Sequence, residues 1–88
     1  MTAGSGRAHF LPEVGSVAAA RRFVAGAVVG LHVDEDALAL LTSEVASNAV
    51  RHARTAFDVV VTTRPEVVRV EVINDAPEML VIRKEPSS

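Results

Sequence analysis

Three polar side chains in the middle of the chain stand four residues apart. Glu44, Asn48 and His52 occupy positions i, i+4 and i+8 in a stretch without a helix-breaking residue. In an α-helix, which turns by about 100° per residue, they form one stripe about 80° wide. A carboxylate, an amide oxygen and an imidazole so aligned can hold a hydrated cation and deprotonate a hydroxyl group or a water molecule. They can equally form i,i+4 hydrogen bonds at the edge of an amphipathic helix, and the spacing alone leaves both interpretations open.

Apolar residues predict the helix that carries this stripe. They fill a broad arc that begins where the stripe ends: Leu38, Leu41, Val45, Ala46, Ala49, Val50 and Ala53. The stripe is therefore expected along the rim of a buried face, on a helix over about 35–53 with Asp34 as its N-cap. An earlier helix is predicted over 17–29, with Ser16 as N-cap and Gly30 as its stop.

The apolar period changes from helical to alternating after this helix. Residues 57–63 are rich in β-branched side chains and residues 67–73 alternate, so the two segments predict an antiparallel hairpin. Residues 8–12 and 79–82 are candidates for short further strands. This order favours an α+β fold, a two-layer sandwich with the helices packed on one face of a mostly antiparallel sheet.

Composition narrows the class of protein. The 88 residues, 49% of them hydrophobic, predict one small domain over 8–82, with a flexible segment over 1–7 and a polar tail over 83–88. Cysteine is absent from the sequence, which excludes disulfides and thiolate metal sites. A net charge of −2 gives no general drive toward nucleic acid, and no partner of that kind is expected. No apolar run approaches the roughly 20 residues of a membrane span, so we expect a cytoplasmic protein without membrane contact.

A family resemblance lies in the pattern Glu44-x-x-x-Asn48-Ala-x-x-His52-Ala, followed by a strand pair that ends in Ile-Asn-Asp75. This arrangement resembles the Bergerat-fold ATPases, the superfamily of histidine-kinase catalytic domains and gyrase. Within it, the chain is most similar to the anti-sigma-factor serine kinases abundant in actinobacteria. The resemblance covers residues 8–82 and implies a partial Bergerat ATPase fold, an incomplete histidine-kinase-like ATPase domain.

The resemblance implies ATP and Mg²⁺ as cofactors and gives each matching residue a role. Asn48 would supply its side-chain oxygen to Mg²⁺, and Glu44 would orient and deprotonate the attacking hydroxyl group. Asp75 would accept a hydrogen bond from the adenine amino group. Arg51 and His52 would lie near the nucleotide or the helix end. For Asp75, an ordinary turn at a strand end is the alternative.

The chain departs from the family pattern where the phosphates should be held. The family's aspartate is followed by glycines, whereas Ala76, Pro77 and Glu78 follow Asp75 here, and no glycine occurs after Gly30. The family continues with a lid and a Gly-x-Gly-Leu segment at a helix N-terminus, where backbone N–H groups cradle the phosphates. Turnover by this chain is therefore not expected. A truncated product of a longer gene would show the same departure.

Three functions remain open at the level of the sequence. The resemblance implies a regulator that binds a sigma factor or an anti-anti-sigma protein and, if active, phosphorylates a serine of that partner with Mg-ATP. The alternatives are a catalytically dead protein-binding module and a structural dimer without a ligand. Without closing strands, the sheet would keep an exposed edge and an uncovered apolar face, which favours a homodimer. Relatives of this branch also dimerise.

Overall fold

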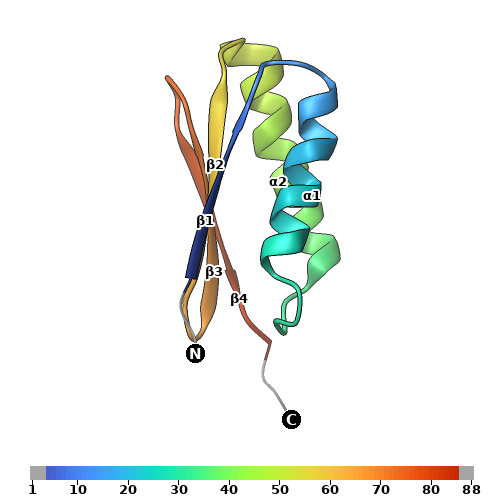
Figure 1. The fold of residues 1–88 in the computed structure, drawn as a ribbon, viewed down its shortest axis with the longest axis vertical. Coiled ribbons are helices and arrows are strands. Elements are labelled where there is room, and N and C mark those ends of the chain that lie inside the picture. Colours follow the sequence, from blue (N-terminus) through green and yellow to red (C-terminus); the bar gives the residue numbers. More distant parts are fainter. Residues whose placement is uncertain (1–3, 86–88) are drawn as a thin grey trace.

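The computed structural model describes residues 4–85, which form a sheet layer and a helix layer (Figure 1). In chain order the elements are β1 (Gly4–Phe10), α1 (Gly15–Ala27), α2 (Glu35–Asn48), a π-helical turn η1 (Ala49–Ala53), β2 (Phe57–Thr63), β3 (Val67–Ile73) and β4 (Glu78–Arg83). The four strands follow one another in the order β1-β2-β3-β4, and every neighbouring pair is antiparallel. Both helices cover the same face of the sheet. The α+β class predicted from the sequence is confirmed at this level.

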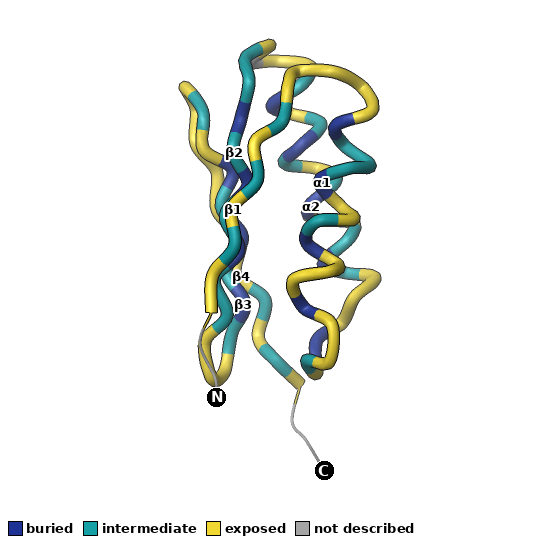
Figure 2. Tube along the Cα trace, viewed as in Figure 1, coloured by how far each residue is buried: buried dark blue, intermediate teal, exposed yellow. Residues whose placement is uncertain are grey.

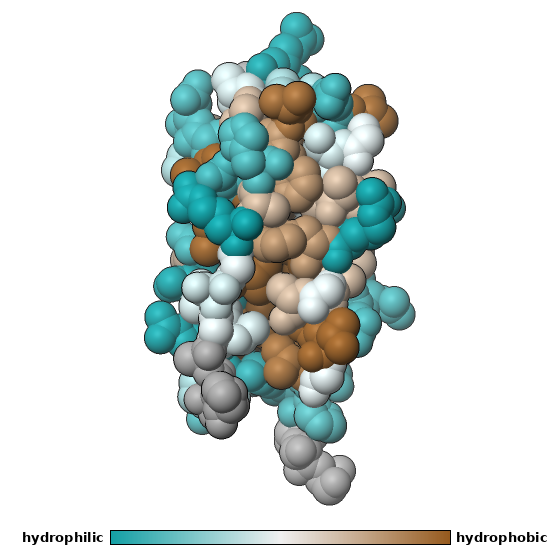
Figure 3. Space-filling view, in the orientation of Figure 1, coloured by the Kyte–Doolittle hydropathy of each residue, from teal (hydrophilic) through white to brown (hydrophobic). Residues whose placement is uncertain are grey.

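The core lies between the two layers and is built mainly from valine. Alternate residues of β2 and β3 point toward the helices because successive side chains of a strand face opposite sides. The fully buried valines on these strands are Val59, Val61, Val68, Val70 and Val72, and they meet Ala20, Val24, Leu38 and Ala46 from the helices. Figure 2 shows these buried stretches facing each other. In Figure 3 the apolar side chains form a seam between the sheet and the helices.

Strand β1 is longer than the sequence predicted. It pairs with β2 along its whole length, from Gly4 opposite Thr63 to Phe10 opposite Phe57. Residues 4–7 therefore belong to the sheet rather than to a flexible segment over 1–7, because the hydrogen-bond ladder holds them in place. Pro12 lies beyond the end of the strand. Residues 1–3 are outside the described part of the chain.

Helix α1 begins two residues earlier than predicted, at Gly15. Val14 occupies the N-cap position without a side-chain hydrogen bond, and Ser16 is buried inside the first turn. The prediction of Ser16 as N-cap is therefore wrong, because this side chain is turned into the molecule. The helix ends at Ala27, and Gly30 adopts the left-handed φ of 83° in the loop that follows.

Helix α2 has the predicted extent but not the predicted regularity. Asp34 caps its start, since the Asp34 Oδ1 accepts a hydrogen bond from the Ala37 backbone N–H at 3.0 Å. After Asn48 the helix widens into the π-turn η1, and the residue that follows it, Arg54, has a left-handed φ of 56°. The Arg54 N–H donates to the Ala49 carbonyl oxygen at 3.0 Å. Such π-turns are rare, and those that do occur are often found at functional sites.

Strands β2 and β3 have the predicted bounds, and β4 extends one residue beyond 79–82 at each end. Arg83 therefore belongs to the sheet rather than to the polar tail, of which residues 86–88 lie outside the described part. Beyond β4 the Glu85 N–H donates to the His32 carbonyl oxygen at 2.6 Å and joins this segment to the α1–α2 loop. Neither helix within residues 4–85 has the length and apolar character needed to cross a membrane.

Candidate functional site

A cavity of about 420 Å³ lies between the C-terminal end of the α2–η1 helix and the turn that joins β3 to β4. The helix contributes Val45, Asn48, Ala49 and His52, and the strands and their turn contribute Val72, Asn74, Ala76 and Glu78. Asn48 and His52, two of the three stripe residues, thus face the same cavity as the turn after β3. The family resemblance implies that this turn contacts the nucleotide base. Apolar walls with a few polar groups, at this volume, are typical of a small-molecule site.

Glu44 lies outside the lining of this cavity and is exposed. The helical turn explains the difference, because Glu44 lies about 40° to one side of Asn48 while Val45 and His52 lie on the other side. Arg51 is also exposed and absent from the lining. The structure therefore brings Asn48 and His52 together at the cavity, whereas Glu44, the residue expected to deprotonate the attacking hydroxyl group, is outside the lining.

The turn after β3 presents Asn74 rather than Asp75 to the cavity. Asn74 is half-buried and lines it, whereas Asp75 is exposed and does not. Strand alternation gives the reason: Asn74 shares the inner side with Val72, and Asp75 follows Ile73 on the other. The sequence indicates Asn74 in this way: Val68, Val70 and Val72 face inward, and the next residue in the same alternation is Asn74.

The Asn74 side chain is held by the turn itself. Its Oδ1 accepts a hydrogen bond from the Ala76 backbone N–H at 2.8 Å. This local contact is an Asx turn, in which an asparagine side chain bonds to the backbone two residues further on. The contact fixes the amide at the wall of the cavity.

Oxygen ligands for a hard cation are few at this site. Within residues 4–85 no group of three or more His, Cys, Asp or Glu side chains is placed to hold a metal ion. The oxygen-bearing side chains of the cavity are those of Asn48, Asn74 and Glu78, and one lone pair of the Asn74 oxygen is engaged by the turn. Mg²⁺ commonly uses one or two protein oxygens together with substrate phosphates and water, so Asn48 and Glu78 suffice only for a metal that arrives with its ligand.

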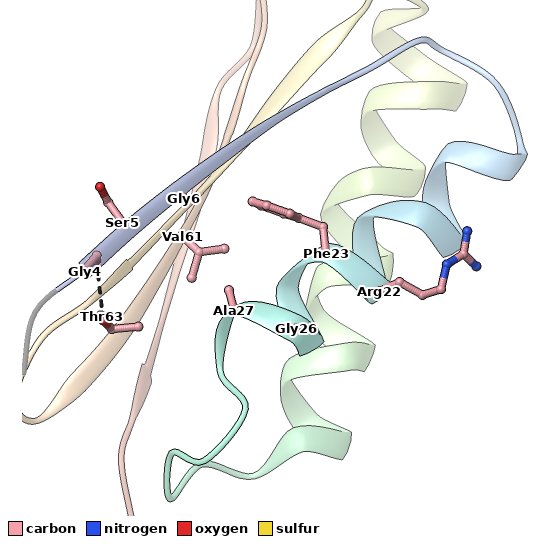
Figure 4. A pocket seen from close by; sticks show the side chains of 9 residues that line it. All are labelled: Gly4, Ser5, Gly6, Arg22, Phe23, Gly26, Ala27, Val61 and Thr63. Atoms are coloured by element: carbon pink, nitrogen blue, oxygen red, sulfur yellow. Dashed lines mark hydrogen bonds between the residues drawn. The ribbon is translucent and has the colours of Figure 1, made fainter.

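A larger hollow of about 590 Å³ lies between the start of β1 and the second half of α1 (Figure 4). Glycines and apolar side chains form most of its lining, and Phe23 points toward β1. Arg22 is the charged residue at this hollow, and Figure 4 shows its guanidinium directed away from the space. The hollow thus exceeds the α2 cavity in volume but offers no group for acid–base or metal chemistry, and we place the candidate site at the α2 cavity.

A polar cluster lies on the bare face of the sheet, which the helices do not cover. Asp58 accepts from Arg7 Nε at 2.6 Å, and its other oxygen lies 2.6 Å from His9 Nδ1. The hydrogen bond with His9, followed by that with Arg7, lowers the pKa of the Asp58 carboxyl group. Among the described residues no hydroxyl group hydrogen-bonds to His9, so the cluster joins β1 to β2 and lacks the nucleophile of a catalytic triad.

The resemblance of the Glu44–Asn48–His52 stripe to a kinase family stays a prediction. Comparison of the chain with models of known protein families, with curated proteins and with solved structures gives no significant match.

Proposed function

We propose that this domain binds a magnesium–nucleotide complex, ATP by the family resemblance, in the cavity beside α2 and acts as a regulator of the anti-sigma-factor kinase type. One observation supports the proposal above the others. Asn48 and His52, distinguished in the sequence by their type and spacing, line one cavity together with the turn after β3.

The chemistry of the lining agrees with a nucleotide. Val45, Ala49 and Val72 offer apolar surface for a planar base. Asn48 offers an amide oxygen, which is a suitable ligand for the hard Mg²⁺ ion. His52 offers an imidazole that donates to a phosphate oxygen when its ring N–H points into the cavity.

Phosphoryl transfer has little support at this site. It needs a γ-phosphate held in line and a residue that orients the nucleophile. Glu44 is outside the lining, and Ala76, Pro77 and Glu78 follow Asp75 at the place where the family has glycines. The proposed domain therefore binds its nucleotide without turning it over, and the regulatory role lies in binding a sigma factor or an anti-anti-sigma protein.

Calorimetric titration of the chain with Mg-ATP tests the proposal. We expect saturable binding that is at least tenfold weaker in Asn48→Ala and unchanged in Ser47→Ala. Ser47 is the matched control because it is the neighbouring polar residue of α2 and does not line the cavity. Since no glycine-rich loop lines the cavity within residues 4–85 to hold the γ-phosphate, ADP and ATP should bind within about threefold of each other. Absence of binding at millimolar ATP, or equal affinity in Asn48→Ala, would contradict the proposal.

A second candidate function is a homodimeric or partner-binding module that has lost the nucleotide. The observation that favours it is the bare face of the sheet, where Met79 is 58% exposed and Val81 is 51% exposed. Strands β1 and β4 also leave free edges at the two sides of the sheet. Exposed apolar surface beside unpaired strand edges favours self-association.

Sedimentation over a range of concentrations tests this second candidate. A dimer through the bare face should dissociate in Val81→Glu and persist in Val14→Glu. Val14 is the matched control because it is 85% exposed at the start of α1, in the helix layer on the opposite side of the sheet from the bare face. A monomer at all concentrations would rule the homodimer out.

A further inference from the structure

The turn between β3 and β4 brings two polar side chains to the cavity, those of Asn74 and Glu78. Asp75, the residue expected to accept a hydrogen bond from adenine, is exposed and absent from the lining. Glu78 is itself exposed, and a carboxylate in contact with water discriminates weakly between ligands. Asn74 is half-buried and is the group on this wall that is held in one orientation.

The Asx turn decides which end of the Asn74 amide is available. An asparagine side chain has one oxygen acceptor and two N–H donors. Its Oδ1 already accepts from the Ala76 N–H at 2.8 Å, which leaves the Nδ2 group free to donate. The fixed polar group on this wall is therefore a hydrogen-bond donor.

We infer that Asn74, rather than Asp75, contacts the base, and that the cavity takes purine nucleotides without selecting the amino group of adenine. The inference rests on the proposed nucleotide function. A donor from Asn74 pairs with a ring nitrogen of adenine or with the carbonyl oxygen that replaces the amino group in hypoxanthine. The adenine amino group is itself a donor and needs an acceptor, which this wall does not hold in place. A site without such an acceptor has no strong means of rejecting a base that lacks the amino group.

Competitive comparison of Mg-ATP with Mg-inosine triphosphate tests the inference, because the second nucleotide carries a carbonyl oxygen in place of the amino group. The two affinities, measured by calorimetry on the full chain, should agree within about threefold. Asn74→Asp is the informative variant, since one carboxylate oxygen can still accept from Ala76 and preserve the turn. Its other oxygen adds an acceptor, which should favour ATP over inosine triphosphate by about tenfold. The ratio is the readout because the added charge weakens both affinities together.

Asp75→Asn is the matched control, since it makes the opposite change at the exposed neighbour and should leave the ratio unaltered. Two results would overturn the inference. In the first, wild type prefers ATP over inosine triphosphate by tenfold or more and Asp75→Asn removes this preference. That result would show that Asp75 contacts the base, and it would leave the proposed function intact. Failure of both nucleotides to bind would refute the proposed function and the base contact with it.

Discussion

Replacing Thr42 with valine is expected to stabilise the domain. Thr42 lies on α2 within the core, its side chain is 0% exposed, and its Oγ1 has no hydrogen-bond partner among the described residues. A buried hydroxyl group without a partner costs about 1–3 kcal/mol, because it loses its hydrogen bonds to water and gains none. Valine has nearly the same shape, and threonine and valine have similar helix propensities. The substitution therefore removes the desolvation cost without opening a cavity.

The expected gain in the free energy of unfolding is about 1 kcal/mol, the lower end of that cost. The gain is at the lower end because the Thr42 hydroxyl group can recover part of the cost by moving toward a backbone carbonyl oxygen of its own helix. For a domain of this size the gain corresponds to an increase of roughly 4–8 °C in Tm. The assay is urea and thermal unfolding followed by circular dichroism at the helix band, since the chain has no Trp or Tyr for fluorescence.

Thr42→Ser provides the control. It keeps the hydroxyl group and removes a buried methyl group, which should lower stability by about 1 kcal/mol. If Thr42→Val instead lowers stability, the hydroxyl group forms a hydrogen bond that contributes to the fold. The reasoning from an unpartnered polar atom would then be refuted.

Three further substitutions probe local contacts in α2, η1 and the sheet. Asp34→Ala removes the N-cap bond of α2 and should cost about 1 kcal/mol in urea unfolding. Arg54→Gly relieves the left-handed backbone at the end of η1 and should raise stability by up to about 1 kcal/mol in the same assay. Asp58→Asn should abolish the pH-dependent contribution that the Asp58 carboxylate makes to the free energy of unfolding. Because hydrogen bonds with His9 and Arg7 lower the pKa of the Asp58 carboxyl group in the folded state below its ordinary value, this contribution is present at neutral pH. It is lost as the pH falls through the lowered pKa, so the urea midpoints of wild type and variant should converge in acid.

Two of these substitutions have a control variant. Asp36→Ala removes a carboxylate from the same first turn of α2 without removing the cap bond, and should cost less than Asp34→Ala. Gly30→Ala introduces a side chain at a φ of 83° and should lower stability where Arg54→Gly raises it. A difference between wild type and Asp58→Asn that stays constant from neutral pH into acid would contradict the role assigned to the His9 and Arg7 contacts.

The fold could be predicted where local chemistry alone decides the structure. Pro65, the β-branched run before it and the alternating valines after it set the bounds of β2 and β3, and the structure has those bounds. Gly4 and Gly6 carry no preference for a strand, so the length of β1 follows from its pairing with β2, which no local pattern reveals. Ser16 has the side chain of an N-cap, but packing buries it, and the helix begins one residue before it.

The site could be predicted in part, for reasons of geometry. The spacing of Asn48 and His52 indicated a shared helix face, and both line the cavity. Glu44 has the same spacing from Asn48, but the cavity lies on the other side of Asn48, and only the position of the β3–β4 turn decides between the two sides. The choice between Asn74 and Asp75 depended on continuing the strand alternation past the end of β3, where the backbone enters a turn and the pattern is hardest to extend.

The direction of α2 limits what the cavity can hold. The helix begins at Glu35 at one end of the molecule, and its C-terminal end with η1 borders the cavity at the other end (Figure 1). Carbonyl groups at a helix C-terminus carry a partial negative charge, whereas phosphate sites usually form at the N-terminus. Arg51 lies in the last turn but is exposed and outside the cavity lining, so its charge offsets this partial negative charge only at the surface. A cation held by Asn48 is favoured by the same helix end that disfavours a free γ-phosphate. Under the proposed function, the direction of the helix therefore favours recognition of a base and a metal over phosphoryl transfer.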